Sequence, residues 1–401
     1  MIDLDIRKTF NINRALEFIA LFLFLFNTAN AQLTDLDTRC LWIVRESMMN
    51  KTEIDSAFIY AHQSGYDIVF VQVRGRGDAL YNSNIVPSHP NIPAGFDPLD
   101  YATKLGHALG LEVHAWINSY ILWSSKFKPQ NQDHLYHAKP AWTEADLNGK
   151  MDWRIDLKSP KSPQWEGIYL SPIHPEVNPY LQAVYKEIID KYNIDGIHFD
   201  YIRYQDDFYG YNPQGRKAFE DIYGIDPRDI VRGIISTRYG WQQTYVDSMK
   251  NAWKDYRQNK VTELVEMVRQ DIILSGKDIK LSAAVKPNLV IAQDRWFQDW
   301  KMWLESDLVD FVVPMNYFKE IKDFNMSVQI MKNNLSRNEL DMIIMGIATY
   351  NQDAQSAADK VLMARLNGFH GVSVFSYDSH KYNLEWFQPV LDALGNPFDE
   401  N

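Results

Sequence analysis

Short apolar runs alternate with amphipathic stretches along most of the chain. The apolar runs predict eight strands, at residues 40–44, 67–73, 111–117, 196–199, 281–285, 309–315, 342–348 and 371–376. Apolar residues at helical spacing between them predict helices near residues 52–64, 98–109, 175–192, 242–274, 296–304, 324–335 and 357–366. Strands that alternate with helices form a parallel sheet through right-handed crossovers. The pattern therefore predicts an α/β protein that closes into a (β/α)8 TIM barrel.

Two polar stretches interrupt this alternation. Residues 118–171, after the third strand, are rich in Pro, aromatic and polar residues and show little periodicity, and residues 205–240 follow the fourth strand. Irregular segments of this length inside a compact domain are usually functional. We therefore expect long loop insertions after strands 3 and 4, lying over one end of a single domain of residues 32–401.

The fourth strand is the one around which the chemistry is organised. Residues 196–199 are followed by Asp200, Tyr201 and Arg203. His198 and Asp200 share one face of the strand, because side chains alternate between faces. In parallel barrels the carboxyl ends of the strands carry the active site. An ionisable cluster at this end favours a functional role over a solvated loop.

The other strands also end in polar and aromatic residues. The side chains that we expect to bind substrate are Gln72, Arg74, Asp78, Trp116, Asn118, His198, Tyr201, Arg203, Asn316, Tyr317 and Tyr350. A ring of Tyr, amide and charged groups suits a neutral polyhydroxylated ligand, which needs polar contacts and flat faces to stack on. The predicted partner is accordingly an oligo- or polysaccharide.

Composition and motifs exclude several other classes. The chain has 401 residues and a formal net charge of −11, with no basic run, which argues against a nucleic-acid partner. There is no H-E-x-x-H, Walker, G-x-G-x-x-G or G-x-S-x-G motif, and His134-x-x-His137 is a weak metal signal. We predict no metal and no cofactor, so acid/base chemistry on carboxylates remains.

The first 31 residues have the features of a secretory signal peptide. Arg7, Lys8 and Arg14 precede an apolar run at residues 18–26, and Ala29-Asn30-Ala31 supplies a cleavage site. The run is too short for a stable membrane anchor, so no span is expected after cleavage. We expect an exported protein, periplasmic or secreted. Its single cysteine excludes an internal disulfide, and its oligomeric state stays open.

Six stretches carry a resemblance to a known family. They are residues 71–81, 96–99, 114–118, 171–177, 194–204 and 309–317. Through them the chain resembles the family-10-like glycosyl hydrolases, which are (β/α)8 barrels once catalogued as a domain of unknown function. The resemblance implies carbohydrate hydrolysis, in some relatives on bacterial cell-wall glycan.

A weaker resemblance links the fourth strand to the chitinase signature D-G-x-D-x-D-x-E. Asp195 and Asp200 fit its first and third acids, whereas His198 replaces the second and Ile202 stands at the glutamate position. Because the chitinase general acid is missing, a chitinase mechanism is not carried over.

The leading hypothesis is a glycoside hydrolase that cleaves O-glycosidic bonds by means of two carboxyl groups. We predict Asp200 as one catalytic group and Asp378, at the end of the eighth strand, as its partner, followed by Glu46 and Asp78. The alternative is a non-catalytic glycan-binding barrel, which the missing glutamate keeps open. An exported deacetylase would need a metal cluster that the spacing does not supply. The sugar, the linkage, endo or exo action and the stereochemical outcome stay open.

Overall fold

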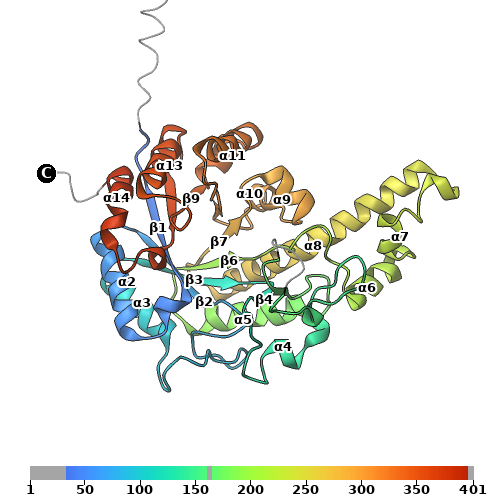
Figure 1. Cartoon of the computed structure of the whole chain (residues 1–401), viewed down its shortest axis with the longest axis horizontal. Helices are drawn as coiled ribbons and strands as arrows, with labels where there is room; N and C mark the ends of the chain where they lie inside the picture. The colour runs from blue at the N-terminus through green and yellow to red at the C-terminus, as the bar shows by residue number, and fades with distance from the viewer. Residues whose placement is uncertain (1–32, 160–164, 396–401) are drawn as a thin grey trace, which may run out of the picture.

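The computed structural model describes residues 33–159 and 165–395, so the predicted signal peptide lies outside the described residues. Eight parallel strands form one sheet, in the order β8-β7-β6-β3-β2-β1-β10-β9 (Figure 1). They are β1 (Thr38–Ile43), β2 (Ile68–Arg74), β3 (Glu112–Asn118), β6 (Gly196–Asp200), β7 (Lys280–Val285), β8 (Phe311–Pro314), β9 (Ile344–Ala348) and β10 (Gly371–Phe375). A parallel bridge between Val312 and Ile343 joins the two outermost strands. The predicted eight strands and barrel are confirmed.

Helices surround this barrel and connect its strands. They are α2 (Lys51–Gln63), α3 (Pro98–Ala108), α5 (Val177–Lys191), α8 (Gln243–Ser275), α9 (Leu289–Arg295), α10 (Trp300–Glu305), α11 (Ile321–Asn334), α12 (Arg337–Asp341), α13 (Ala354–Leu366) and α14 (Gln388–Leu394). Side chains cap several of them: Asn50 accepts a hydrogen bond from Glu53 N at the start of α2, and Asp97 does so from Asp100 N at the start of α3.

One predicted helix is wrong in its bounds. Residues 296–304 were expected to be continuous, but α9 ends at Arg295 and α10 begins at Trp300. Phe297 between them has a φ of 52°, a left-handed conformation that a helix cannot contain. The Asp299 side chain then caps α10 by accepting from Met302 N. Apolar periodicity alone does not reveal this break.

Both interruptions contain short elements of their own. The insertion after β3 holds β4 (Ile121–Trp123), α4 (Leu135–Ala138) and β5 (Ile168–Tyr169), and β4 pairs with β5 in a separate antiparallel two-stranded sheet. The insertion after β6 holds α6 (Pro213–Tyr223) and α7 (Pro227–Val231). In Figure 1 these two helices lie alongside the first half of α8, and that half extends well away from the barrel.

Aromatic side chains fill the interior of the barrel. The His198 ring on β6 lies 4.2 Å from the Phe70 ring and 4.7 Å from the Trp42 ring, centroid to centroid. Trp116 packs edge-on against Trp42 at 4.7 Å. Both tryptophans are fully buried or nearly so. Packed side chains therefore occupy the barrel interior beneath the carboxyl ends of these strands.

Gly196 gives a test of this packing. A Cβ atom at this position would lie 2.3 Å from His114 Nδ1, and His114 is completely buried. Gly196→Ala should therefore lower the free energy of unfolding by about 1–3 kcal/mol, the usual cost of overpacking a core. Thermal unfolding followed by circular dichroism measures the change. An unchanged melting temperature would show that the His114 ring moves aside without cost.

Candidate active site

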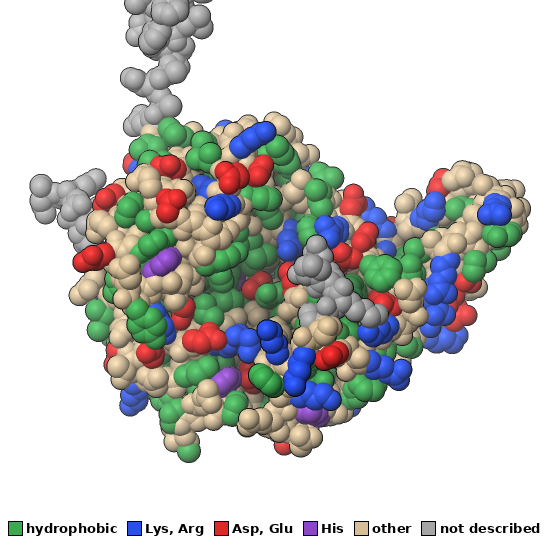
Figure 2. All heavy atoms as spheres, in the orientation of Figure 1, with side chains coloured by type: hydrophobic (Ala, Val, Ile, Leu, Met, Phe, Trp, Pro, Cys, Tyr) green, Lys and Arg blue, Asp and Glu red, His purple; other side chains and the backbone are tan. Residues whose placement is uncertain are grey.

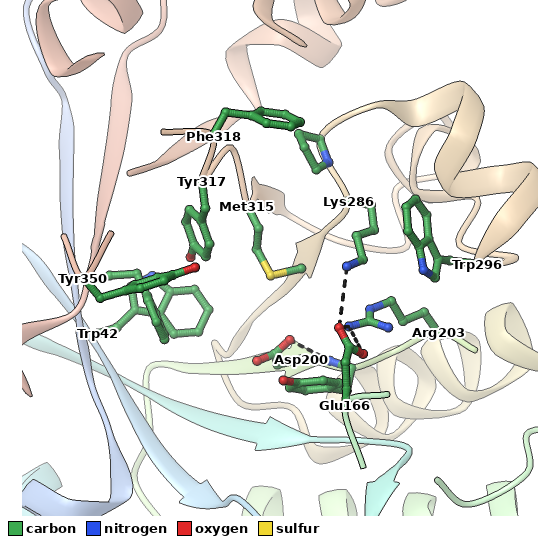
Figure 3. A pocket seen from close by; sticks show the side chains of 13 residues that line it. Trp42, Glu166, Asp200, Arg203, Lys286, Trp296, Met315, Tyr317, Phe318 and Tyr350 are labelled. Carbon is green, nitrogen blue, oxygen red and sulfur yellow. Dashed lines mark hydrogen bonds and ion pairs between the residues drawn. The ribbon is translucent and has the colours of Figure 1, made fainter. Parts of the chain in front are cut away.

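A cavity of about 460 Å³ opens at the carboxyl ends of the strands. Figure 2 shows it as a hollow lined mainly by hydrophobic side chains, with acidic groups inside, and Figure 3 shows its walls from close by. Most of the lining residues carry rings or charges; they are Trp42, Glu166, Asp200, Tyr201, Arg203, Lys286, Pro287, Trp296, Met315, Tyr317, Phe318, Tyr350 and Phe375.

Asp200 is the last residue of β6 and lies at the cavity floor with 6% of its surface exposed. Its Oδ1 accepts a hydrogen bond from Tyr201 N at 2.7 Å, and its Oδ2 accepts one from Trp116 Nε1 at 3.2 Å. Burial raises the pKa of this carboxyl to about 6, although the Tyr201 N–H and the Arg203 charge partly oppose the shift. Asp200 can therefore hold and release a proton near neutral pH.

Glu166 is a second carboxylate in the same cavity, and it comes from the insertion after β3. Arg203 Nη2 donates to both of its oxygens, at 3.1 and 2.9 Å, and Tyr169 also donates its hydroxyl to Glu166. Lys286 Nζ lies 3.9 Å from Oε1. Burial alone would raise the pKa of Glu166, but the charges of Arg203 and Lys286 and these hydrogen bonds together leave it below its usual value. Glu166 is therefore ionised.

Lys286, the first residue after β7 (Lys280–Val285), is the second cation beside Glu166. Its ammonium lies 4.7 Å from the centre of the Trp296 ring. Burial, and then the neighbouring charge of Arg203, lower the pKa of Lys286 to about 8. Figure 3 shows Lys286 and Arg203 pointing at Glu166 from one side of the cavity, with Asp200 beside them.

The two carboxyl groups differ in protonation because their surroundings differ. Asp200 accepts hydrogen bonds but has no cation within ion-pair distance among the described residues, whereas Glu166 is held by two. The negative charge of Glu166 itself adds to the raised pKa of Asp200. A proton-holding carboxyl beside an ionised one is the arrangement that assigns an acid and a base.

Several predicted binding residues lie beneath Asp200 and support it. Trp116 Nε1 donates to Asn118 Oδ1 at 2.9 Å as well as to Asp200, and Gln72 Nε2 reaches the same Asn118 oxygen at 3.4 Å. Arg74, fully buried, donates to the backbone carbonyls of Asn118 and Ser119. The structure brings these four side chains together, but below the cavity and not on its wall.

Three other predicted binding residues lie apart from the cavity wall. His198 is buried in the barrel, and its Nδ1 lies 2.7 Å from Ser282 Oγ. Asp78 is paired with His89 at 3.8 Å, and Asn316 Nδ2 donates to Phe324 O at 3.1 Å. Tyr201, Arg203, Tyr317 and Tyr350 do line the cavity. The Tyr317 ring there is stacked 5.4 Å from that of Phe375.

Asp378, the predicted catalytic partner, does not line the cavity. Its Oδ2 accepts from Val44 N at 2.7 Å and its Oδ1 from Ser47 Oγ at 2.6 Å. These two hydrogen bonds link the turn after β1 to the segment that follows β10. Glu46, the next candidate, pairs with Arg45 at 3.0 Å and has a half-exposed side chain.

The two histidines of the weak metal motif are bound to the backbone. His134 Nε2 lies 2.8 Å from Arg76 O, and His137 Nε2 lies 2.8 Å from Pro129 O. Within residues 33–159 and 165–395, no group of three or more His, Cys, Asp or Glu side chains is arranged to hold a metal ion. No helix in those same ranges has the length and apolar character needed to cross a bilayer.

Comparison with protein families assigns this barrel. The family described as glycosyl hydrolase-like 10 matches residues 37–364. The chain belongs to the glycosyl hydrolase-like 10 family. It is 24% identical over 301 residues to the glycosyl hydrolase DigH of Escherichia coli (strain K12), covering 69% of this chain and 58% of that protein. It is also 24% identical over 327 residues to the glycosyl hydrolase YngK of Bacillus subtilis (strain 168), covering 72% and 56%.

The chain therefore spans less than two thirds of the length of these curated relatives. Solved structures share the fold at low identity. The glycoside hydrolase domain of PgaB (BpsB) from Bordetella bronchiseptica has a TM-score of 0.65 at 12% identity, covering 89% of this chain and 99% of that one. The β-amylase catalytic domain from Paenibacillus polymyxa has a TM-score of 0.53 at 10% identity, covering 87% and 94%. The fold of this glycosyl hydrolase-like 10 member is thus that of TIM-barrel glycoside hydrolases.

Sequence reasoning missed part of the cavity of this family member. The residues that it did not assign to the site are Trp42, Glu166, Lys286, Pro287, Trp296, Met315, Phe318 and Phe375. Lys286 and Trp42 stand at or near strand ends, a signal that could have found them. Glu166 follows an irregular stretch with no periodicity, where several other acids, such as Asp152 and Asp156, were equally eligible.

The buried carboxyl at position 200 should lower stability above about pH 6. Its pKa is higher in the folded chain than in the unfolded one, so the native state binds an extra proton between about pH 4 and 6, and stability falls as pH rises through that window. Asp200→Asn removes this charge but also one of two accepted hydrogen bonds. We expect a gain of about 1–2 kcal/mol at pH 8, and none below pH 4.

Urea unfolding at the two pH values measures this difference. Asp190→Asn, which alters an exposed carboxylate at the end of α5, is the matched control and should show no such pH dependence. A variant at position 200 that is less stable than the wild type at pH 8 would contradict the raised pKa.

Proposed function

We propose that this protein is an exported glycoside hydrolase that cleaves O-glycosidic bonds of a polysaccharide, bacterial cell-wall glycan being one candidate. One observation carries the proposal: Asp200, buried and with a raised pKa, shares an open ring-lined cavity with the ionised Glu166. Family membership and the TIM-barrel neighbours support a hydrolase that acts on glycans.

The two carboxyl groups would divide the work of hydrolysis. Protonated Asp200 donates its proton to the glycosidic oxygen as the bond to the leaving sugar breaks. Glu166 stays ionised because Arg203 and Lys286 hold it so, and it acts on the other side of the reaction, as base or as nucleophile. Trp296 and Tyr350, which are only partly buried, present ring surface to the sugars.

The alternative of a glycan-binding barrel rests on the same ion pairs. Arg203 and Lys286 offset much of the negative charge of Glu166, and a carboxylate held in this way is a weaker base than a free one. A binding protein would keep the aromatic cavity and its affinity for glycans without turnover. Activity measurements on carboxylate variants separate the two functions.

Asp200→Asn should reduce kcat by about 10²–10⁴-fold, because an amide cannot donate the required proton. The substrate for this measurement is the polymer that the wild type hydrolyses fastest in a panel of cell-wall, plant and host glycans. Wild-type activity should fall as pH rises above about 6, where Asp200 loses its proton, and the residual activity of the variant should lack that limb. Asp190→Asn is the control. Full activity in the Asp200→Asn variant would exclude Asp200 as the general acid.

Glu166→Gln and Asp378→Asn decide which carboxylate is the partner of Asp200. We expect Glu166→Gln to lower kcat by about 10²–10⁴-fold with little change in binding, because only Glu166 lines the cavity with Asp200. Asp378→Asn should lower the melting temperature instead, since it weakens the contacts to Val44 and Ser47. The opposite outcome, with kcat lost only at position 378, would return the catalytic role to Asp378.

A further inference from the structure

A second groove, of about 620 Å³, lies in the insertion after β3. Residues 126–128, 136–137 and 153–158, with Pro140, form its walls, and we call it the basic groove. It contains Lys126, Lys128, Arg154 and Lys158, whose side chains are exposed, but only one acid, Asp156. In a chain with a formal net charge of −11, this local excess of positive charge is unusual.

The four cations have no acidic partner among the described residues. By contrast, Lys139, just outside the groove, does have an acidic partner: its Nζ lies 3.9 Å from Glu176. Asp156 uses its Oδ1 to accept a hydrogen bond from the backbone N of Lys158 at 3.0 Å, which closes a local turn. The positive charge of the basic groove is therefore left available to a ligand.

Aromatic rings hold three of these cations in place. Lys128 Nζ lies 5.8 Å from the Tyr136 ring centre, Lys158 Nζ lies 5.7 Å from that of Phe127, and the Arg154 guanidinium lies 4.9 Å from that of Trp153. Cations held over rings lose less freedom when they bind an anion than free surface lysines do. Three of the four cations therefore lie within cation–π distance of rings that also line the groove.

Arg76 links the basic groove to the active-site end of the barrel. It follows β2, its Nε donates to Ser124 Oγ at 2.9 Å, and its carbonyl contacts His134 at 2.8 Å, beside the groove wall. Burial and the neighbouring charge of Arg45 lower the pKa of the Arg76 guanidinium. Figure 2 shows basic side chains gathered along one edge of the hollow. Arg76 thus contacts the insertion that carries the groove while it lies just after a barrel strand.

We propose that the basic groove is a distal binding site for an acidic polysaccharide, whose carboxylate groups contact Lys126, Lys128 and Lys158 while another part of the same polymer reaches the cavity. This inference rests on the proposed function for its role in an enzyme, but the binding itself requires no turnover. The polar and aromatic residues at the strand ends suit a neutral ligand, whereas the basic groove adds a preference for negative charge.

A carboxylated glycan fits the groove better than a membrane surface does. A peripheral membrane site is typically an amphipathic helix whose apolar face enters the bilayer beside a basic face. Here the groove is concave, and Phe127, Tyr136 and Trp153 each have a cation over the ring. Sugar carboxylates repeated along a chain match cations distributed along a groove.

The test compares carboxymethyl cellulose with hydroxyethyl cellulose, which share a backbone and differ in charge. Native gels that contain each polymer measure retardation of the full chain. We expect the acidic polymer to retard the wild type, and added salt to reduce the effect because it screens exposed charges. The triple variant Lys126→Gln, Lys128→Gln and Lys158→Gln should bind on the order of tenfold more weakly, from the loss of three exposed ion pairs.

The matched control removes the same charge elsewhere. Lys104, Lys217 and Lys332 are exposed on α3, α6 and α11, and their change to Gln should leave retardation unchanged. Equal weakening in both triple variants would overturn the proposal by showing that only net charge matters. Equal retardation by both polymers would overturn the requirement for carboxylates. Sedimentation with phosphatidylglycerol vesicles but no retardation by carboxymethyl cellulose would assign the groove to membranes.

These outcomes are separable from those of the proposed function. If the wild type hydrolyses no glycan but the acidic polymer still binds through the three lysines, the hydrolase proposal fails and the groove stands. If a glycan is hydrolysed and the lysine variants bind the acidic polymer normally, the binding-site proposal is wrong and the hydrolase proposal is retained. Should both hold, the lysine variants should raise KM for an acidic polymer without lowering kcat.

Discussion

The contact between the Arg203 guanidinium and the Glu166 carboxylate determines what the cavity can do. Arg203 is 2% exposed, and it reaches both Glu166 and the Tyr169 hydroxyl, so that the loop after β6 and the insertion after β3 meet at one cation. Arg203 is buried whereas the Glu166 side chain is one-third exposed, so loss of Glu166 would leave a buried cation without its carboxylate partner. This contact keeps Glu166 charged, and it also holds that carboxylate in the same cavity as Asp200.

The filled barrel interior supplies the other half of the electrostatics. Trp42, Trp116, Phe70 and His198 pack beneath the strand ends and exclude water from below Asp200. A carboxyl in such surroundings loses solvation and keeps its proton to higher pH. The difference in pKa between Asp200 and Glu166 therefore arises from their positions. Asp200 ends a strand above an apolar core, whereas Glu166 lies beside two cations, Arg203 and Lys286.

The sequence was sufficient for the barrel because apolar runs and helical stripes report burial directly. It was also sufficient for Asp200, Tyr201, Arg203, Tyr317 and Tyr350 as residues at strand ends, and in the structure all five line the cavity. Strand-end position could not separate wall residues from those one layer below, such as Trp116 and Asn118, since both kinds follow the same alternation. Glu166 could not be predicted as a cavity residue because its placement depends on a long-range contact with Arg203. No local sequence pattern indicates such a contact.

The origin of Glu166 in an insertion separates the second carboxylate of the cavity from the barrel itself. The barrel supplies Asp200 from a strand that cannot move without disturbing its neighbours, whereas Glu166 lies two residues before β5, which pairs with β4. Lengthening or replacing that insertion would change one of the two cavity carboxylates and leave the scaffold intact. The composition of such a cavity can therefore diverge among barrels of one fold without any redesign of the strands.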